Sequence, residues 1–296
     1  MNPVVSTPTI TTKTDTIIYL DDVTVDYDGF KALSRLNFYM DRRELRVVIG
    51  PNGAGKTTLL DVISGSVRPV TGRVIFGHHT DLTHLQENEI AALGIGRKFQ
   101  TPSVFVNLTV RENVELSLRR SSKGVLSTLF ERGDAADERH RVEETLERVG
   151  LAATSGVLAG ALSHGEKQWL EIGMVMAQDP ELLLVDEPVA GMTDEETART
   201  GELLMAIAAD RSVLVIEHDM EFVRQIARKV TVLHQGTVLC EGPVDQVQRD
   251  PRVLEVYLGQ RREDSSANRA AAELPAVRGE PRSGGEPSGE MASGAR

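Results

Sequence analysis

Short, nearly continuous apolar segments alternate with longer amphipathic segments along most of the chain. The apolar segments are typical of buried strands and the amphipathic ones of helices. Strands are predicted at 16–27, 44–50, 73–77, 181–188, 212–219 and within 230–242. Helices are predicted at 56–65, at 83–94 from a Thr83-x-x-Gln86 capping box, at 194–210 and at 219–228. This alternation predicts a mostly parallel sheet covered by helices on both faces.

Residues of about 101–160 show a different pattern, without strand-like apolar runs. A Thr109-x-x-Glu112 capping box precedes one amphipathic segment, and a charged amphipathic segment follows at 135–150. We therefore expect a helical subdomain at about 101–160, inserted into a folded domain that spans 17–260. Residues 1–16 are predicted to be a flexible lead. Residues 261–296, of which 13 are Pro, Gly or Ser, are predicted to be a disordered tail.

Composition narrows the function classes. A net charge of −11 argues against a nucleic-acid partner, because phosphate neutralisation needs excess Lys and Arg. The single cysteine, Cys240, excludes an internal disulfide. No apolar run approaches the ~20 residues that span a bilayer, and the start of the chain does not resemble a secretory signal. We expect a cytoplasmic protein that docks onto a membrane partner.

A phosphate-binding loop is predicted directly after the strand at 44–50. The segment "GPNGAGKTT" fits G-x-x-x-x-G-K-[ST] and opens a helix, which is the context that the motif requires. Its backbone N–H groups and the positive end of the helix would bind phosphate oxygens. Lysine would reach the β- and γ-phosphates, and the next hydroxyl would ligate Mg²⁺. The loop comprises Gly50, Pro51, Asn52, Gly53, Ala54, Gly55, Lys56, Thr57 and Thr58.

Two carboxylates end the apolar run "LLLVDEP". Asp186 lies where a strand ends, the edge at which open α/β sheets bind ligands, and is a candidate Mg²⁺ partner. Glu187 follows at once and is the candidate base that positions the attacking water. A GTPase would need [NT]-K-x-D after the loop, but that string occurs only at 12–15. A small-molecule kinase would have no need of the segment "LSHGE" at 162–166.

At this point the chain resembles one family, the ATPase subunits of ATP-binding cassette (ABC) transporters. The resemblance spans about 17–260 and consists of "GPNGAGKTT", "RKFQ", "LSHGE", "LLLVDEP" and "IEHD" in that order. It implies an α/β, P-loop (RecA-like) fold in which a mostly parallel sheet is joined by an antiparallel β subdomain and an inserted helical subdomain. It implies ATP and Mg²⁺ as cofactors.

The resemblance also implies roles for single residues. Tyr27 would stack on adenine, and His218 would contact the γ-phosphate. Gln100 would touch Mg²⁺ and the attacking water, and would lie at the hinge into the helical subdomain. The segment Ser163, His164, Gly165 and Glu166 would bind the γ-phosphate of ATP held by the opposite subunit. Two cassettes would thus close head to tail on two MgATP, and closure would be transmitted to the permease.

Three residues depart from the family pattern. His164 replaces a glycine, and Glu166 replaces a glutamine of the usual Leu-Ser-Gly-Gly-Gln. Ser163-x-x-Glu166 also fits a capping box, so Glu166 has two possible orientations: back onto the cap or toward phosphate. Thr193 stands where the family usually has an aspartate.

Within the family, the segments 96–118, 163–197 and 216–259 look most like the ATPase of urea-uptake systems, which are relatives of branched-chain amino-acid importers. That likeness implies a second cassette ATPase, identical or related, two integral permease subunits and an extracytoplasmic solute-binding protein. The chain would lie peripherally on the cytoplasmic face of the inner membrane. Two alternatives remain: the ATPase of a branched-chain amino-acid importer, and a soluble cassette ATPase without a transport role.

Overall fold

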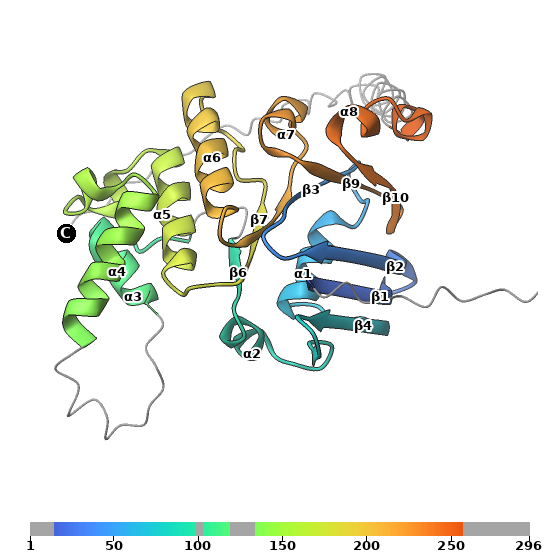
Figure 1. Ribbon diagram of the computed structural model, residues 1–296, viewed down its shortest axis with the longest axis horizontal. Coiled ribbons are helices and arrows are strands. Elements are labelled where there is room, and N and C mark those ends of the chain that lie inside the picture. Colours follow the sequence, from blue (N-terminus) through green and yellow to red (C-terminus); the bar gives the residue numbers. More distant parts are fainter. Residues whose placement is uncertain (1–14, 99–102, 119–133, 257–296) are drawn as a thin grey trace, which may run out of the picture. The chain divides into compact units, whose positions relative to one another are not determined.

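The computed structural model describes residues 15–98, 103–118 and 134–256 (Figure 1). Within these residues, six strands form one sheet in the order β10–β9–β3–β8–β7–β6. Neighbouring strands run parallel except β10, which pairs antiparallel with β9 at the edge. The predicted mostly parallel sheet is therefore confirmed. Its strands are β3 (Leu45–Ile49), β6 (Ile95–Lys98), β7 (Leu182–Asp186), β8 (Ser212–Ile216), β9 (Lys229–His234) and β10 (Thr237–Gly242).

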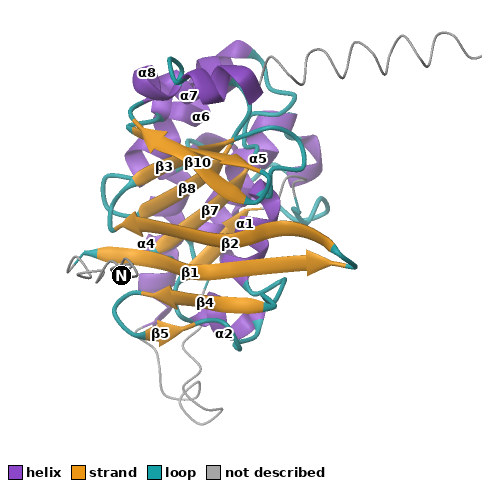
Figure 2. Ribbon diagram, turned by 90° about the vertical axis from the view of Figure 1, so that its right-hand side faces the viewer, coloured by secondary structure: helices purple, strands orange, loops and turns teal. Residues whose placement is uncertain are grey.

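A second, antiparallel sheet has the order β2–β1–β4–β5 within the described chain (Figure 2). Its strands are β1 (Thr16–Tyr27), β2 (Phe30–Asp41), β4 (Thr71–Phe76) and β5 (Thr80–Asp81). The hydrophobic pattern predicted β1 and β4 but not β2. Yet the second half of β2 alternates as a half-buried strand should, with Leu36, Phe38 and Met40 buried and the residues between them exposed.

Two hydrophobic cores form because alternate residues of each parallel strand point to opposite faces of the sheet. Val47, Val185 and Val215 belong to the core that α5 (His164–Met176), α6 (Asp194–Ile207) and α7 (Met220–Ile226) cover. Val48 and Leu184 belong to the other core, which they share with the antiparallel sheet and α1 (Lys56–Ser64). Helix α1 lies between the two sheets, so the end of β3 and the start of α1 are held on both sides.

In the inserted region, α3 (Val110–Ser117) and α4 (Asp134–Arg148) pack on α5 (Figure 1). The region also contains two 3-10 turns at Ala152–Thr154 and Ala159–Ala161. The capping boxes at Thr109–Glu112 and Ser163–Glu166 are confirmed, and each starts its helix where predicted. α8 (Val244–Val247) follows β10. Among the described helices, none is long and apolar enough to cross a membrane.

One local prediction was wrong, and one strand of the mostly parallel sheet was not predicted. The helix expected from Thr83 begins instead at Glu87, as α2 (Glu87–Ala92), and its capping box joins Gln86 to Glu89. The Thr83 hydroxyl accepts the N–H of Val74, in β4, at 3.1 Å. The hydroxyl is therefore bonded to a strand and does not cap a helix. Strand β6 was not predicted because two of its residues, Arg97 and Lys98, are charged. The predicted lead (1–16) and tail (261–296) lie almost wholly outside the described residues.

Candidate active site

The phosphate-binding loop joins β3 to α1 and depends on glycine for its close contacts. Gly55 has φ +96°, and a Cβ atom on it would lie 2.4 Å from the Ala32 carbonyl oxygen in β2. A Cβ atom on Gly50 would lie 2.3 Å from the Leu233 carbonyl oxygen in β9. Larger side chains would push the loop away from both sheets. Glycine at these positions leaves the N–H groups at the start of α1 pointing into a tight loop.

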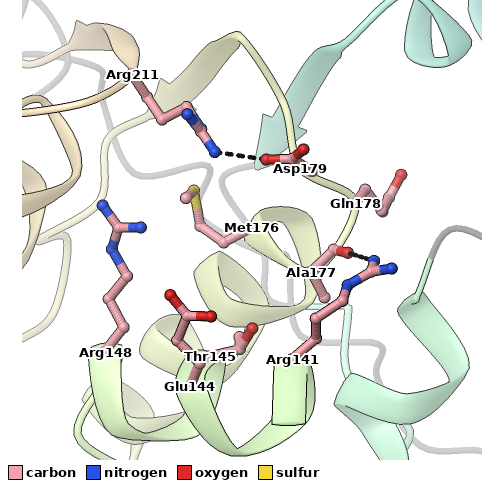
Figure 3. A pocket seen from close by; sticks show the side chains of 9 residues that line it. All are labelled: Arg141, Glu144, Thr145, Arg148, Met176, Ala177, Gln178, Asp179 and Arg211. Carbon is pink, nitrogen blue, oxygen red and sulfur yellow. Dashed lines mark hydrogen bonds and ion pairs between the residues drawn. The ribbon is translucent and has the colours of Figure 1, made fainter. Parts of the chain in front are cut away.

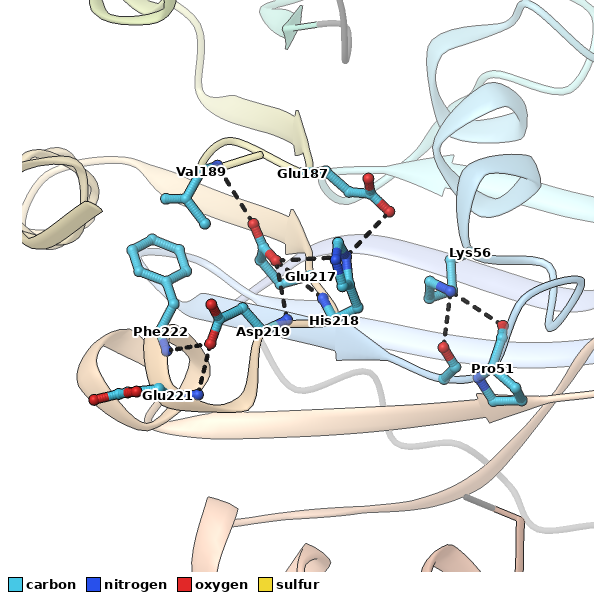
Figure 4. Close-up of polar contacts among 10 residues, drawn as sticks. Pro51, Lys56, Glu187, Val189, Glu217, His218, Asp219, Glu221 and Phe222 are labelled. Carbon is cyan, nitrogen blue, oxygen red and sulfur yellow. Dashed lines mark hydrogen bonds and ion pairs between the residues drawn. The ribbon is translucent and has the colours of Figure 1, made fainter. Parts of the chain in front are cut away.

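Lys56 is the first residue of α1, and its side chain turns back over the loop. Its Nζ donates to the carbonyl oxygens of Gly50 at 2.8 Å and Pro51 at 3.1 Å (Figure 4). Burial lowers the pKa of Lys56, while the charges of Glu187 and Asp186 oppose that shift. The lysine therefore lies within the field of both carboxylates. The other predicted loop residues occupy the loop and the first turn of α1: Asn52 and Gly53 exposed, Ala54 buried, Thr57 exposed and Thr58 half-buried.

Strands β3, β8 and β7 are adjacent and parallel, so their carboxyl ends meet at one edge of the sheet. Asp186 ends β7 with only 6% of its surface exposed. Burial raises the pKa of its carboxyl, an effect that Arg97 opposes and Glu187 reinforces. Arg97, from β6, is itself held by Asp61 of α1 at 2.7 Å. This edge thus carries a buried carboxylate within the field of an ion pair.

Glu187 and His218 face each other across this edge (Figure 4). The His218 Nδ1 lies 3.4 Å from Glu187 Oε1. Glu187 has a left-handed backbone, with φ +43°, and its N–H donates to the Ile216 carbonyl oxygen at 3.0 Å. A non-glycine residue in this conformation is uncommon and is found where surrounding structure holds it. The turn directs the Glu187 side chain toward His218, which lies two residues after the end of β8.

Sequence reasoning missed the role of Glu217, although it stands within the quoted motif "IEHD". Its side chain is 1% exposed and accepts the N–H groups of His218 at 2.9 Å, Asp219 at 3.3 Å and Val189 at 3.5 Å. Burial raises its pKa, which these donors partly offset. Glu217 thus ties the turn after β8 to the turn after β7. A charged residue at the end of an otherwise apolar strand was the available signal.

The segment "LSHGE" forms the start of α5. Ser163 accepts the Glu166 N–H at 3.1 Å, and Glu166 Oε2 accepts the Ser163 N–H at 2.8 Å. Glu166 therefore folds back onto the cap, which answers the question that the sequence left open. His164 is the first helical residue, without a positive φ, so histidine replaces glycine there without backbone strain. Its Nε2 lies 3.1 Å from the Ala190 carbonyl oxygen, in the loop after β7.

Thr193, the other departure, caps α6. Its hydroxyl accepts the Glu196 N–H at 3.3 Å, and Glu196 Oε2 accepts the Thr193 N–H at 3.0 Å. Threonine therefore starts this helix as an aspartate would, since both are good N-cap residues. Asp194, in the first turn, has no part in this pair.

The structure gives less information on two predicted site residues, Tyr27 and Gln100. Tyr27 ends β1 opposite Phe30 and is 45% exposed, on the hairpin whose second strand contacts Gly55. Gln100 lies outside the described residues. The residues on either side of that gap meet one partner on α5: Glu171 Oε1 accepts the Ser103 N–H at 3.3 Å, and Glu171 Oε2 lies 3.8 Å from the Lys98 Nζ.

A cavity of about 430 Å³ lies elsewhere, between α4, the end of α5 and the loop before β8 (Figure 3). Its three arginines are engaged: Arg211 with Asp179 at 2.5 Å, Arg148 with Asp210 at 2.6 Å and Arg141 with the Ala177 carbonyl oxygen at 3.1 Å. None of the predicted phosphate-binding residues lines it. The candidate site is therefore the edge at β3, β7 and β8, not this cavity.

Comparisons with known proteins identify the family to which the chain is similar. Residues 33–190 match the ABC transporter family, and residues 237–263 match the family described as branched-chain amino acid ATP-binding cassette transporter. The chain is 33% identical to the high-affinity branched-chain amino acid transport ATP-binding protein LivG of Escherichia coli over 82% of its own length and 98% of LivG. It is 32% identical to BraF of Pseudomonas aeruginosa, of the same description and coverage.

Solved structures show the same fold. The ADP conformation of MJ1267, an ATP-binding cassette of an ABC transporter, is 30% identical with a TM-score of 0.71, covering 82% of this chain and 99% of that one. The dimeric post-hydrolysis state of the cassette MJ0796, bound to ADP and Pi, is 25% identical with a TM-score of 0.65, covering 77% and 99%. The predicted cassette fold is thus confirmed. The named relatives transport branched-chain amino acids, so they support the alternative rather than the urea interpretation. The chain belongs to the ABC transporter family, as the ATP-hydrolysing subunit of a transporter of the branched-chain amino acid importer type.

Proposed function

We propose that this chain drives import of branched-chain amino acids by closing on MgATP with a second cassette and hydrolysing the nucleotide. The observation that carries hydrolysis is the meeting of Lys56, Asp186, Glu187 and His218 at the carboxyl ends of three adjacent parallel strands. Backbone donors of residues 50–58 would bind the phosphates, with Lys56 on the β- and γ-phosphates. Tyr27 would stack on the adenine.

The donor groups at this edge fit Mg²⁺. Magnesium prefers oxygen ligands from hydroxyls, carboxylates, waters and phosphates. The Thr57 hydroxyl is exposed at the start of α1, and Asp186 is a buried carboxylate whose pKa burial raises. A cation would offset the penalty of ionising Asp186 there. Thr57, Asp186 and Gln100 would hold the ion, whose charge would neutralise the phosphate oxygens.

Glu187 is the proposed general base. A carboxylate beside the γ-phosphate would accept a proton from the attacking water. Its side chain is partly exposed, at 24%, so water can reach it. His218 would bind the γ-phosphate and, at 3.4 Å, hold the Glu187 carboxylate in place. Glu217, which fixes the His218 backbone, would set the position of that imidazole.

Each site would be completed by the other subunit. Ser163, His164, Gly165 and Glu166 begin α5, whose N–H groups and positive end favour an anion. A γ-phosphate bound to one cassette would attract this helix start of its partner, so closure would require ATP. Gln100, two residues after Lys98 in the sequence, would pass closure to the helices that pack on α5.

The transported solute and the remaining partners rest on similarity. The relatives named above, together with the match at 237–263, favour branched-chain amino acids. The chain would work on the cytoplasmic face of the inner membrane with two permease subunits and an extracytoplasmic binding protein. Urea is the competing solute.

Uptake of labelled leucine and labelled urea, in cells lacking the gene, tests the assignment. We expect leucine uptake to fall and to return with the wild-type chain but not with Glu187→Gln. Loss of urea uptake alone would overturn the amino-acid assignment, and unchanged uptake of both would overturn a transport role for these solutes. As a matched control, the cells are complemented with a chain that carries Glu221→Gln, an exposed residue in the first turn of α7.

A further inference from the structure

The start of α5 already holds a carboxylate from the neighbouring helix. The Ser163 hydroxyl donates to Glu196 Oε1 at 3.0 Å, and the Gly165 N–H lies close enough to the same carboxylate to help lower its pKa. Glu196 lies in the first turn of α6, 33 residues further along the chain. Both donors belong to the segment proposed to bind the γ-phosphate of the partner's ATP.

The start of α5, at Ser163 and Gly165, has room for the oxygen of an anion. A Cβ atom on Gly165 would lie 2.5 Å from Glu196 Oε1, so glycine is what lets an acidic oxygen approach this N–H. The hydrogen bond from the Thr193 N–H lowers the pKa of Glu196 most, and those from Ser163 and Gly165 lower it further. Glu196 is therefore ionised at neutral pH. Its negative charge also suits the positive end of α5.

The carboxylate of Glu166, in the first turn of α5, does not compete with Glu196 for these donors. Glu166 is turned onto the Ser163 N–H at 2.8 Å. Glu196 uses its second oxygen, Oε2, to accept the Thr193 N–H at 3.0 Å. One side chain thus bridges the starts of α5 and α6. Because a hydroxyl has one proton to donate, Ser163 cannot serve Glu196 and a phosphate oxygen at once.

We propose that Glu196 is an internal competitor for the γ-phosphate, which closure must displace from Ser163 and Gly165. This inference rests on the proposed action of Ser163 and Gly165 on the partner's ATP. Displacement makes closure less favourable and raises the ATP concentration that it requires. Open cassettes are thereby favoured until ATP binds.

Glu196→Gln tests the proposal, because glutamine retains a capping box with Thr193 while removing the charge. The assembled transporter would carry Glu187→Gln, so that closed cassettes occlude ATP without hydrolysing it. Radiolabelled ATP retained through gel filtration is measured against ATP concentration. We expect Glu196→Gln to reduce the concentration for half-maximal occlusion by roughly three- to tenfold, as hydrogen bonds to charged acceptors exceed those to neutral ones.

Glu195→Gln is the matched control. It removes the same charge from the same helical turn, but Glu195 is exposed and lies outside the capping box. The control should leave the half-maximal concentration unchanged. If both variants changed the half-maximal ATP concentration equally, the cause would be the net charge of the helix and not the contact with Ser163. That result would overturn the proposal. A higher concentration for Glu196→Gln would show that Glu196 positions Ser163 for phosphate, which also overturns it.

The same experiment distinguishes a failure of the proposed function from a failure of the competitor role of Glu196. If the Glu187→Gln transporter occludes no ATP at any concentration, closure on ATP is wrong, whatever Glu196 does. If it occludes ATP normally, but Glu196→Gln follows the same curve, only the competitor role is wrong. Thermal unfolding of Glu196→Gln near that of the parent chain would confirm that the helix start is intact.

Discussion

The Nδ1 atom of His218 lies 3.4 Å from Oε1 of Glu187, although the two residues follow different strands. The left-handed backbone of Glu187 turns its side chain across the carboxyl edge of the sheet. The buried carboxylate of Glu217 accepts N–H groups from the turn after β7 and from the turn after β8. The position of the proposed base therefore depends on a buried acid that binds the backbone of both turns.

Glu187→Gln should bind ATP like the wild type and hydrolyse it at least ~10²-fold more slowly, the usual size of a general-base effect. Steady-state phosphate release and equilibrium nucleotide binding would measure the two quantities. Glu221→Gln, at an exposed residue in the first turn of α7, is the control. Turnover near that of the wild type would remove Glu187 from the role of base.

Asp186→Asn should raise the stability of the protein while it abolishes turnover. Burial raises the pKa of Asp186, so its contribution to stability is present below the ordinary pKa of 3.8 and is lost as pH rises through the raised one. At pH 8 the variant should gain on the order of 1 kcal/mol in the free energy of unfolding. At acid pH, where Asp186 is protonated, the gain should vanish. Denaturant unfolding at both pH values measures this; a gain that grew on acidification would contradict it.

Lys98 and Glu171 form a buried pair, with side chains 0% and 6% exposed. Burial lowers the pKa of Lys98 and raises that of Glu171, and each charge opposes the shift of the other. Lys98→Met alone should lower the free energy of unfolding by about 3–5 kcal/mol, because it leaves a buried carboxylate uncompensated. Lys98→Met with Glu171→Leu should recover most of that loss. Additive losses in the double variant would refute the pairing.

Gly55→Ala should be more damaging than Gly53→Ala, although both residues have positive φ. Nothing lies within 4 Å of a Cβ built on Gly53, so alanine there meets only the left-handed backbone penalty of about 1–2 kcal/mol. A Cβ on Gly55 would also lie 2.4 Å from the Ala32 carbonyl oxygen. Thermal unfolding and ATP affinity should both fall further for Gly55→Ala. Equal losses would mean that β2 does not shape the loop.

Local rules predicted much of this fold because they act over a few residues. The capping boxes at Thr109 and Ser163 join residues three apart, and the buried strands β3, β7 and β8 are nearly all apolar. The same rules failed at β6, because the charged side chains of Arg97 and Lys98 are buried there. Each is paired with a carboxylate, Asp61 or Glu171. They failed at Thr83, whose hydroxyl is taken by the backbone of β4. The three partners, Asp61, Glu171 and Val74, lie nine or more residues away in the chain, so hydrophobic periodicity does not reveal these contacts.

The sequence by itself therefore determined the phosphate-binding loop, the buried strands β3, β7 and β8 with the helices that follow them, and the identity of the acids that follow β7 and β8. These features depend on residue type and short spacing. The tertiary structure alone decided which acids meet: Glu187 with His218, Glu217 with both turns, and Glu196 with Ser163 at the start of α5. Such contacts arise when packing of the sheet and helices brings distant side chains within hydrogen-bonding distance, and only then can their charges act on one another.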